Sequence, residues 1–267
     1  MSNGSIIATP LAALGRMFLL RLAGLGRFFI FLSRAFSHLF ILPLQVPKVL
    51  EQIYFIGMKS LFVICLTGIF TGMVLGLQGY YTLVKFGSEG LLGAAVALTL
   101  IRELGPVLTA IMVVGRAGSA MSAEIGIMRI SEQIDALKTM DIDPVRFLVS
   151  PRIVAALISF PLLTAIFDTV GIFGGYLTGS KLLGINPGIF FARVESSVVM
   201  ADVTGGFIKS LVFAVVVVGV CCYRGYMTHT SAQGFGARGV SFSTTNAVVQ
   251  SSVLILICDY VITSVLL

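Results

Sequence analysis

The chain contains a run of 25 uncharged residues, SLFVICLTGIFTGMVLGLQGYYTLV, between Lys59 and Lys85. An α-helix needs about 20 predominantly apolar residues to cross the hydrocarbon core of a bilayer, so this run is long enough to be a transmembrane helix. Only 11% of all residues are charged, whereas soluble domains have about 25%. The mean hydropathy of +1.02 leaves too few polar groups to cover a water-facing surface. We therefore interpret the chain as an integral membrane protein.

Four further apolar segments follow, at approximately residues 91–115, 153–179, 207–223 and 245–267. Together with the first they predict an all-α integral membrane protein with five transmembrane helices. The segments between them differ in basic residues, since thirteen Lys and Arg fall on one side of the membrane and four on the other. The positive-inside rule then predicts a cytoplasmic N-terminus and a C-terminus on the outer side. The net charge of +6 thus reflects orientation rather than nucleic-acid binding.

The N-terminal segment, residues 1–50, is predicted to form an amphipathic interfacial helix and an elbow ahead of a five-span domain, residues 51–267. At about 100° per residue, four of its basic residues share one side of a helix, where they would meet lipid phosphates. These residues are Arg16, Arg27, Arg34 and His38. The alternative is a true first span whose arginines snorkel to the interface. Pro43 and Pro47 would end the helix before the next segment.

Glycines recur at four-residue spacing in two of the predicted spans. They are Gly68, Gly72 and Gly76 in the first span, and Gly171, Gly175 and Gly179 in the third. A row of glycines lets the backbone of another helix approach closely, which favours helix association in a membrane. The pattern leaves two possibilities open, namely packing within one subunit and a subunit interface at the first span.

The longest predicted cytoplasmic loop, residues 116–152, is the least lipid-like part of the chain. Within it, Ser131 is positioned to cap a short helix over residues 131–141, and Pro144 prevents the simple continuation of that helix. A short helix lying across two spans is a plausible docking element for a soluble partner. The loop could equally serve only to connect its neighbouring spans.

The sequence contains none of the common nucleotide-binding, hydrolase or metalloprotease motifs. There is no Gly-Lys dipeptide, so no P-loop for ATP, and no G-x-S-x-G or H-E-x-x-H motif. The four cysteines lie in apolar surroundings, and two histidines are too few for a typical metal site. We therefore expect a chain without catalytic residues, bound metal or cofactor.

Arg102 and Glu103 stand in the middle of the second predicted span. A charge near the bilayer centre costs several kcal/mol, so both must face protein or water. Pro106 removes a backbone donor and can bend the helix there. This favours a functional site over a purely structural ion pair. Asp168 and Asp259 are single carboxylates in other spans, to which the sequence assigns no role.

Several segments taken together resemble the MlaE family, the permease subunits of phospholipid ABC transporters. They are GIFTGMVLGLQGY (68–80), IRELGPVLTA (101–110), GRAGSAMSAEIG (115–126), EQIDAL (132–137), DPVRFLVSPR (143–152) and SFPLLT (159–164). The resemblance extends over nearly the whole chain from about residue 45 onward, in the expected order and spacing.

The resemblance implies a homodimer in the inner membrane of a Gram-negative envelope that moves phospholipids between this membrane and a periplasmic MCE-domain hexamer, maintaining outer-membrane lipid asymmetry. It also implies two cytoplasmic ABC ATPase subunits, which use ATP and Mg, and a small STAS-domain accessory subunit. The 131–141 segment would then be a coupling helix seated in the ATPase subunit. Its contact residues would be Glu132, Asp135 and Lys138.

By position in the matched motifs, the resemblance also implies a lipid cavity lined by Leu75, Gln78, Leu83, Arg102 and Glu103, with Lys209 and Arg238 as weaker assignments. Arg102 would supply a cation for the lipid phosphate. Glu103 would either hold Arg102 in place or help to expel the headgroup.

Two other functions remain possible on the sequence alone. One is an ion-coupled secondary transporter that uses Glu103, Asp168 or Asp259 as proton carriers. The other is a scaffold that only anchors the MCE assembly.

Overall fold

The computed structural model describes residues 5–38, 45–230 and 236–266, with side chains in the first helix described at Leu19 and from Leu22 onward. Within these ranges the chain is helical and contains no strand. Five helical stretches are long and apolar enough to cross a membrane, which confirms the predicted all-α fold with five spans. They cover Val46–Val84, Glu89–Ile130, Pro144–Leu182, Met200–Tyr226 and Ala237–Leu266.

Three of the spans consist of several helical segments joined end to end. The first contains α2 (Val46–Ile53), η2 (Tyr54–Met58) and α3 (Lys59–Val84). The second contains η3 (Glu89–Leu91), α4 (Leu92–Thr99), η4 (Leu100–Leu104), α5 (Gly105–Val113), η5 (Val114–Gly118) and α6 (Ser119–Ile130). The third contains α8 (Pro144–Leu148), α9 (Ser150–Tyr176) and η6 (Leu177–Leu182). The last two are the single helices α11 (Met200–Tyr226) and α12 (Ala237–Leu266).

The spans are longer than the hydropathy pattern predicts, because the helices continue past their apolar part. Pro47 lies in the first turn of α2, where a backbone N–H is not needed. The expectation that Pro47 ends a helix is therefore wrong, because Pro47 lies inside α2, which begins at Val46. The region of Pro43 lies outside the described residues.

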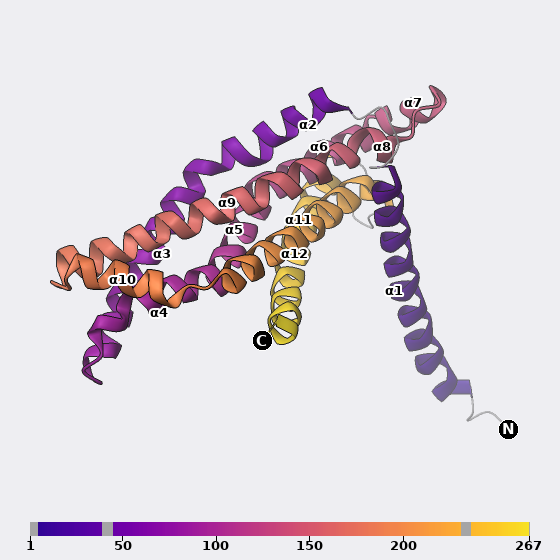
Figure 1. Cartoon of the computed structure of the whole chain (residues 1–267). Helices are drawn as coiled ribbons and strands as arrows, with labels where there is room; N and C mark the ends of the chain where they lie inside the picture. Colours follow the sequence, from indigo (N-terminus) through magenta and orange to yellow (C-terminus); the bar gives the residue numbers. More distant parts are fainter. Residues whose placement is uncertain (1–4, 39–44, 231–235, 267) are drawn as a thin grey trace.

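Helices α3 and α9 pack backbone to backbone along their glycines, side by side in Figure 1. A Cβ atom at Gly72 would lie 1.8 Å from the carbonyl oxygen of Gly171, and one at Gly76 would lie 3.1 Å from that of Gly175. The two glycine rows thus face each other within one chain, as the first of the two possibilities predicts. A subunit interface built on the row in the first span is wrong, because α9 of the same chain covers it.

The remaining elements lie near the ends of the bundle. One end of the bundle, which we call the α7 end, contains the start of α2 and the end of α6 (Figure 1). The short helices α7 (Gln133–Thr139) and η7 (Thr228–Thr230) also lie at this end. At the other, the α10 end, α3 stops and α10 (Pro187–Ser197) packs against α4. The hydropathy pattern does not predict α10, whose residues lie between two apolar segments. Its start is nevertheless marked by Asn186, whose side chain accepts a hydrogen bond of 2.8 Å from the N–H of Gly188.

The first helix, α1 (Ser5–Ser37), is not among the five apolar spans. Its N-terminal part lies away from the other helices, and it meets the bundle with its C-terminal part, at α8 and α11 (Figure 1). There the rings of Phe28 and Phe31 contact the ring of Tyr223 edge to face. Its exposed side chains include apolar ones, such as Leu22 and Phe29, as well as Arg27 and Arg34. The position of Arg16 on the basic side lies outside the described side chains.

Candidate functional site

Charged side chains gather inside the bundle where η4, α11 and α12 meet. Lys209 of α11 is 3% exposed, and its Nζ lies 2.7 Å from Oε2 of Glu103 and 3.0 Å from Oδ1 of Asp259. The same ammonium group donates a hydrogen bond of 2.8 Å to the carbonyl oxygen of Arg102. Thr263 of α12 completes the group, donating to Oε1 of Glu103 at 3.3 Å. One buried cation thus joins three helices, and we call Glu103, Lys209, Asp259 and Thr263 the charged cluster.

Pro106 explains why a backbone carbonyl is available to Lys209. In a regular helix the carbonyl of Arg102 would accept from the N–H four residues later, and that residue is Pro106, which has none. The ammonium group of Lys209 takes this place. The proline in the middle of the span is thus compensated by a side chain from another helix.

Arg102 forms a second ion pair beside the charged cluster. Its Nε lies 2.7 Å from Oδ1 of Asp202, and the other carboxylate oxygen of Asp202 accepts from the N–H of Val199 at the start of α11. The Arg102 side chain is 43% exposed, whereas that of Asp202 is 9% exposed. A guanidinium group has five N–H donors in a planar fork, so the exposed nitrogens can bind an anion such as a phosphate.

The structure brings together three of the residues that the sequence analysis selected, Arg102, Glu103 and Lys209. Arg102 and Glu103 do not pair with each other, because neighbours on a helix point apart. The option that Glu103 holds Arg102 in place is therefore wrong: Glu103 contacts Lys209 and Asp202 holds Arg102. Asp202 and Thr263 were missed, and Asp259 had no role, since their partners lie about 50 to 160 residues away along the chain.

The other selected residues lie elsewhere. Leu75 and Leu83 of α3 are partly buried against the core, and Gln78 is exposed. Helix α3 packs on α9, α4 and α5, whereas α11 and α12 carry most of the charged cluster. Arg238 is exposed in the first turn of α12, about 32 Å along the helix axis from Asp259. Within a single chain these four residues and the charged cluster thus do not form one site.

The short helix α7 is narrower than the predicted range 131–141 and is not capped by Ser131. The hydroxyl of Ser131 donates to the carbonyl of Ile127 in the preceding helix, and α7 starts after Glu132, which has a φ of 58°. Ser131 is the C-terminal cap position of α6, and a hydroxyl there bonds backwards to a free carbonyl. The expectation of a Ser131 cap is therefore wrong, although the helix itself exists.

Asp135 fixes α7 to the rest of the α7 end. Its Oδ1 accepts from Nη1 of Arg129 at 2.8 Å and from Nζ of Lys138 at 2.9 Å, and these two bonds hold the pKa of the carboxyl below its usual value. Arg129 also donates to Nδ1 of His229 at 3.0 Å. Partial burial, together with the charge of Arg129, lowers the pKa of His229. Four side chains from three segments therefore form one network around α7.

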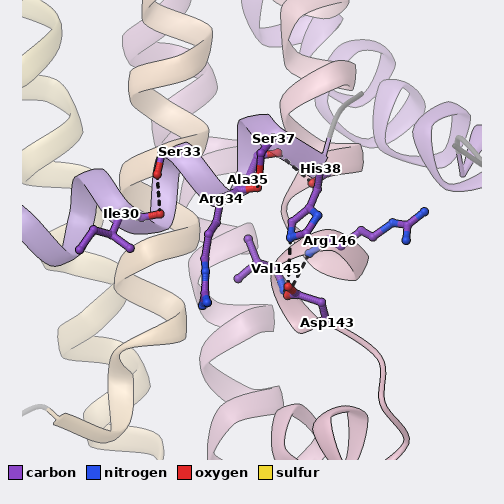
Figure 2. A network of polar contacts seen from close by, with 10 residues as sticks. Ile30, Ser33, Arg34, Ala35, Ser37, His38, Asp143, Val145 and Arg146 are labelled. Carbon is purple, nitrogen blue, oxygen red and sulfur yellow. Dashed lines mark hydrogen bonds and ion pairs between the residues drawn. The ribbon is translucent and has the colours of Figure 1, made fainter. Parts of the chain in front are cut away.

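A second network connects α1 to the start of the third span (Figure 2). The carboxylate of Asp143 caps α8 by accepting from the N–H of Val145 at 2.8 Å, and its other oxygen lies 3.0 Å from Nε2 of His38. Ser150 donates to the carbonyl of Ala35 at 3.1 Å. The end of α1 is thus attached to the loop that carries α7.

The fold and the site together define a helical membrane protein with several spans, with the charged cluster inside its bundle and the short polar helix α7 at one end. The family model described as Permease MlaE matches residues 49–265. The chain belongs to the MlaE permease family.

The sequences of individual relatives support the same family assignment. The intermembrane phospholipid transport system permease protein MlaE of Haemophilus influenzae is 42% identical over 221 residues, 82% of this chain and 83% of that protein. A probable ABC transporter permease protein of Rickettsia typhi is 42% identical over 84% of this chain and 85% of its own length. One from Synechocystis is 39% identical over 85% of each.

Proposed function

We propose that this chain is the permease subunit of an ABC transporter that moves phospholipids between the inner membrane and a periplasmic MCE-domain partner, and so maintains the lipid asymmetry of the outer membrane. The name of the Haemophilus relative supports phospholipid as the cargo. The names of the Rickettsia and Synechocystis relatives support an ABC transporter, in which ATP hydrolysis belongs to a separate subunit.

The observation that carries the proposal is the exposed guanidinium of Arg102 beside the charged cluster. Among the described residues, its one ion pair uses Nε on Asp202, so its Nη atoms are available for a lipid phosphate. Lys209, by contrast, is enclosed by Glu103 and Asp259 and serves to hold the three helices together. Arg102 would thus bind the headgroup, while apolar side chains such as Leu75 and Leu83 accommodate the acyl chains.

The proposed complex contains two copies of this chain with their N-termini in the cytoplasm. Two ABC ATPase subunits, which use ATP and Mg, lie below, and an MCE hexamer lies above, with a STAS-domain protein as an accessory. Helix α7 is the proposed coupling helix, because Lys138 on it and Glu132 directly before it are exposed. The chain itself binds no cofactor and has no catalytic residue. Closure of the ATPases would move α7 and squeeze the lipid cavity between the two permeases.

The test is to purify the complex from its native membrane in mild detergent and to identify subunits and lipids by native mass spectrometry. The complex is then reconstituted, and ATP-dependent transfer of labelled phospholipid is measured for Arg102→Met and for Arg193→Met, which removes an exposed arginine on α10. Loss of one charge-assisted headgroup contact of about 1.5–3 kcal/mol predicts a loss of roughly tenfold or more for Arg102→Met, and no comparable loss for the control.

Two outcomes would contradict the proposal. If no ATPase subunit accompanies the chain and transport follows a proton gradient, the chain is an ion-coupled transporter. If neither variant alters transfer although ATPase and MCE subunits are present, Arg102 is not a headgroup ligand, and a scaffold that only anchors the MCE assembly becomes the better description.

A further inference from the structure

Asp168 of α9 carries a carboxyl group inside the spans that the proposed function does not use. A Cβ atom at Gly105 would lie 1.8 Å from Oδ1 of Asp168, so this oxygen packs directly on the backbone where η4 passes into α5. Oδ1 is buried, and no described residue forms a hydrogen bond with it. A buried polar atom without a partner is rare in folded proteins and calls for a specific role.

The carboxyl group faces a small cavity of about 180 Å³ between α9, η4 and α11. The walls include Ile101, Phe207 and Thr164, whose buried hydroxyl also has no partner among the described residues. The charged residues on the two facing elements are Arg102, Glu103, Asp202, Lys209 and Arg224. The first four are paired with one another or with Asp259, and Arg224, in the last turn of α11, donates to Gln250. Burial among apolar groups disfavours an unpaired carboxylate and favours the neutral acid, which can donate a hydrogen bond.

The backbone of η4 offers an acceptor at this cavity. The N–H of Gly105 bonds to the carbonyl of Leu100, which is the wider spacing of a π-helix. The Ile101 carbonyl therefore loses its usual donor four residues later, and the residue five later is Pro106, which has no N–H. The Ile101 oxygen points toward α11, since a Cβ atom at Gly206, another residue of the cavity wall, would lie 2.7 Å from it.

We propose that Asp168 is a positioning residue whose neutral carboxyl group donates to the free Ile101 carbonyl, directly or through one water molecule in the cavity, and so holds the turn that presents Arg102 and Glu103. The arrangement parallels the adjacent carbonyl of Arg102, which Lys209 satisfies from the other side. A cavity of this size has room for a water molecule. This inference rests on the proposed transport function, in which Arg102 binds the headgroup.

The test uses the reconstituted complex with Asp168→Asn, which keeps a donor of the same shape, and Asp168→Leu, which keeps the volume and removes the donor. Thr245→Val is the control, because Thr245 is exposed on α12, does not line this cavity and donates only to a carbonyl of its own helix. We expect phospholipid transfer within twofold of the unsubstituted complex for Asn and Val, and a loss of roughly tenfold for Leu, the effect of one lost buried hydrogen bond. The pH profile with Asn should match that of the unsubstituted complex from about pH 6 to pH 8.

A double variant separates positioning from a general loss of structure. If Asp168 acts on the turn that contacts Lys209, then Asp168→Leu should add less than about threefold to the loss caused by Lys209→Met, whereas independent effects would multiply. The inference would be overturned if the losses caused by Asp168→Leu and Lys209→Met multiplied. It would also be overturned if Asp168→Asn impaired transfer as much as Asp168→Leu, or if Asp168→Asn shifted the pH profile. If Asp168→Leu fails to assemble, the Asn variant decides alone. Failure of the unsubstituted complex to move phospholipid would instead refute the proposed function.

Discussion

At the scale of single residues, Lys209 is the cation on which the charged cluster depends. Replacement by Met keeps the length of the side chain but leaves Glu103 and Asp259 facing each other inside the spans. Removing one partner of a buried ion pair costs about 3–5 kcal/mol, and the partial exposure of Glu103 reduces that cost. We expect Lys209→Met to lower the free energy of unfolding by about 2–4 kcal/mol, measured by denaturant unfolding in detergent.

Two comparisons make this prediction specific. Lys85→Met removes an exposed lysine at the end of the first span and should change stability by less than about 0.5 kcal/mol. Adding Glu103→Gln and Asp259→Asn to Lys209→Met removes the uncompensated charges and should recover much of the loss. Equal unfolding midpoints for Lys209→Met and the original chain would show that the cluster contributes nothing to stability.

Single residues are also where the sequence is both most and least informative about the site. Arg102 and Glu103 can be selected from the sequence, because charges in an apolar run are costly and must face protein or water. Their partners cannot be selected in this way. Asp202 stands at the edge of a span, where a carboxylate is unremarkable, and Asp259 lies on a different helix, so only the packing of α11 and α12 on η4 shows the pairing.

At the scale of elements, the contact between α3 and α9 depends on glycines that let the two backbones touch. Gly72→Ala places a methyl group 1.8 Å from the carbonyl oxygen of Gly171, and neither backbone atom can move without separating the helices. Overpacking typically costs about 1–3 kcal/mol, and we expect Gly72→Ala to lower the free energy of unfolding by an amount at the upper end of this range. Gly115→Ala is the matched control, since beyond its chain neighbours and the nearby backbone of its own helix no described atom lies within 4 Å of its Cβ position. It should be neutral or stabilise by up to about 1 kcal/mol, because alanine favours helix. Thermal unfolding in detergent compares the two, and equal melting temperatures would show that the helices are not packed this closely.

Elements are predictable from the sequence where one physical signal dominates. Hydropathy locates all five spans, since only helices of sufficient length and apolarity can cross a membrane. It does not locate helix ends outside the apolar part, nor α10, whose mixed composition resembles a loop. The prediction that Ser131 caps α7 is wrong for a related reason. A serine hydroxyl between two helices can accept from an N–H of the following helix or donate to a carbonyl of the preceding one, and tertiary packing decides between them.

At the scale of the whole molecule, the direction of α1 is the feature that local patterns determine least. A basic side and an apolar side are compatible both with a helix in the interface and with a span whose arginines snorkel. The contacts of Phe28 and Phe31 with Tyr223, and the attachment of His38 to Asp143, fix only the C-terminal part of α1 on the bundle. The N-terminal part of α1 lies away from the other helices (Figure 1), and an interfacial position of α1 stays a prediction.

The depth of α1 in a bilayer can be measured directly, because the chain contains no tryptophan. Single replacements Leu22→Trp and Phe29→Trp report on exposed positions of α1, and Phe70→Trp reports on an exposed position in α3. An interfacial helix keeps its apolar side about 5–10 Å below the headgroups along its whole length, so quenching by lipids brominated near the headgroup should be strong and equal at positions 22 and 29. Position 70 should respond to bromine deep in the acyl chains. If positions 22 and 29, about 10 Å apart along a helix, differ by that depth, then α1 crosses the membrane, the number of spans becomes six, and the two ends of the chain lie on the same side.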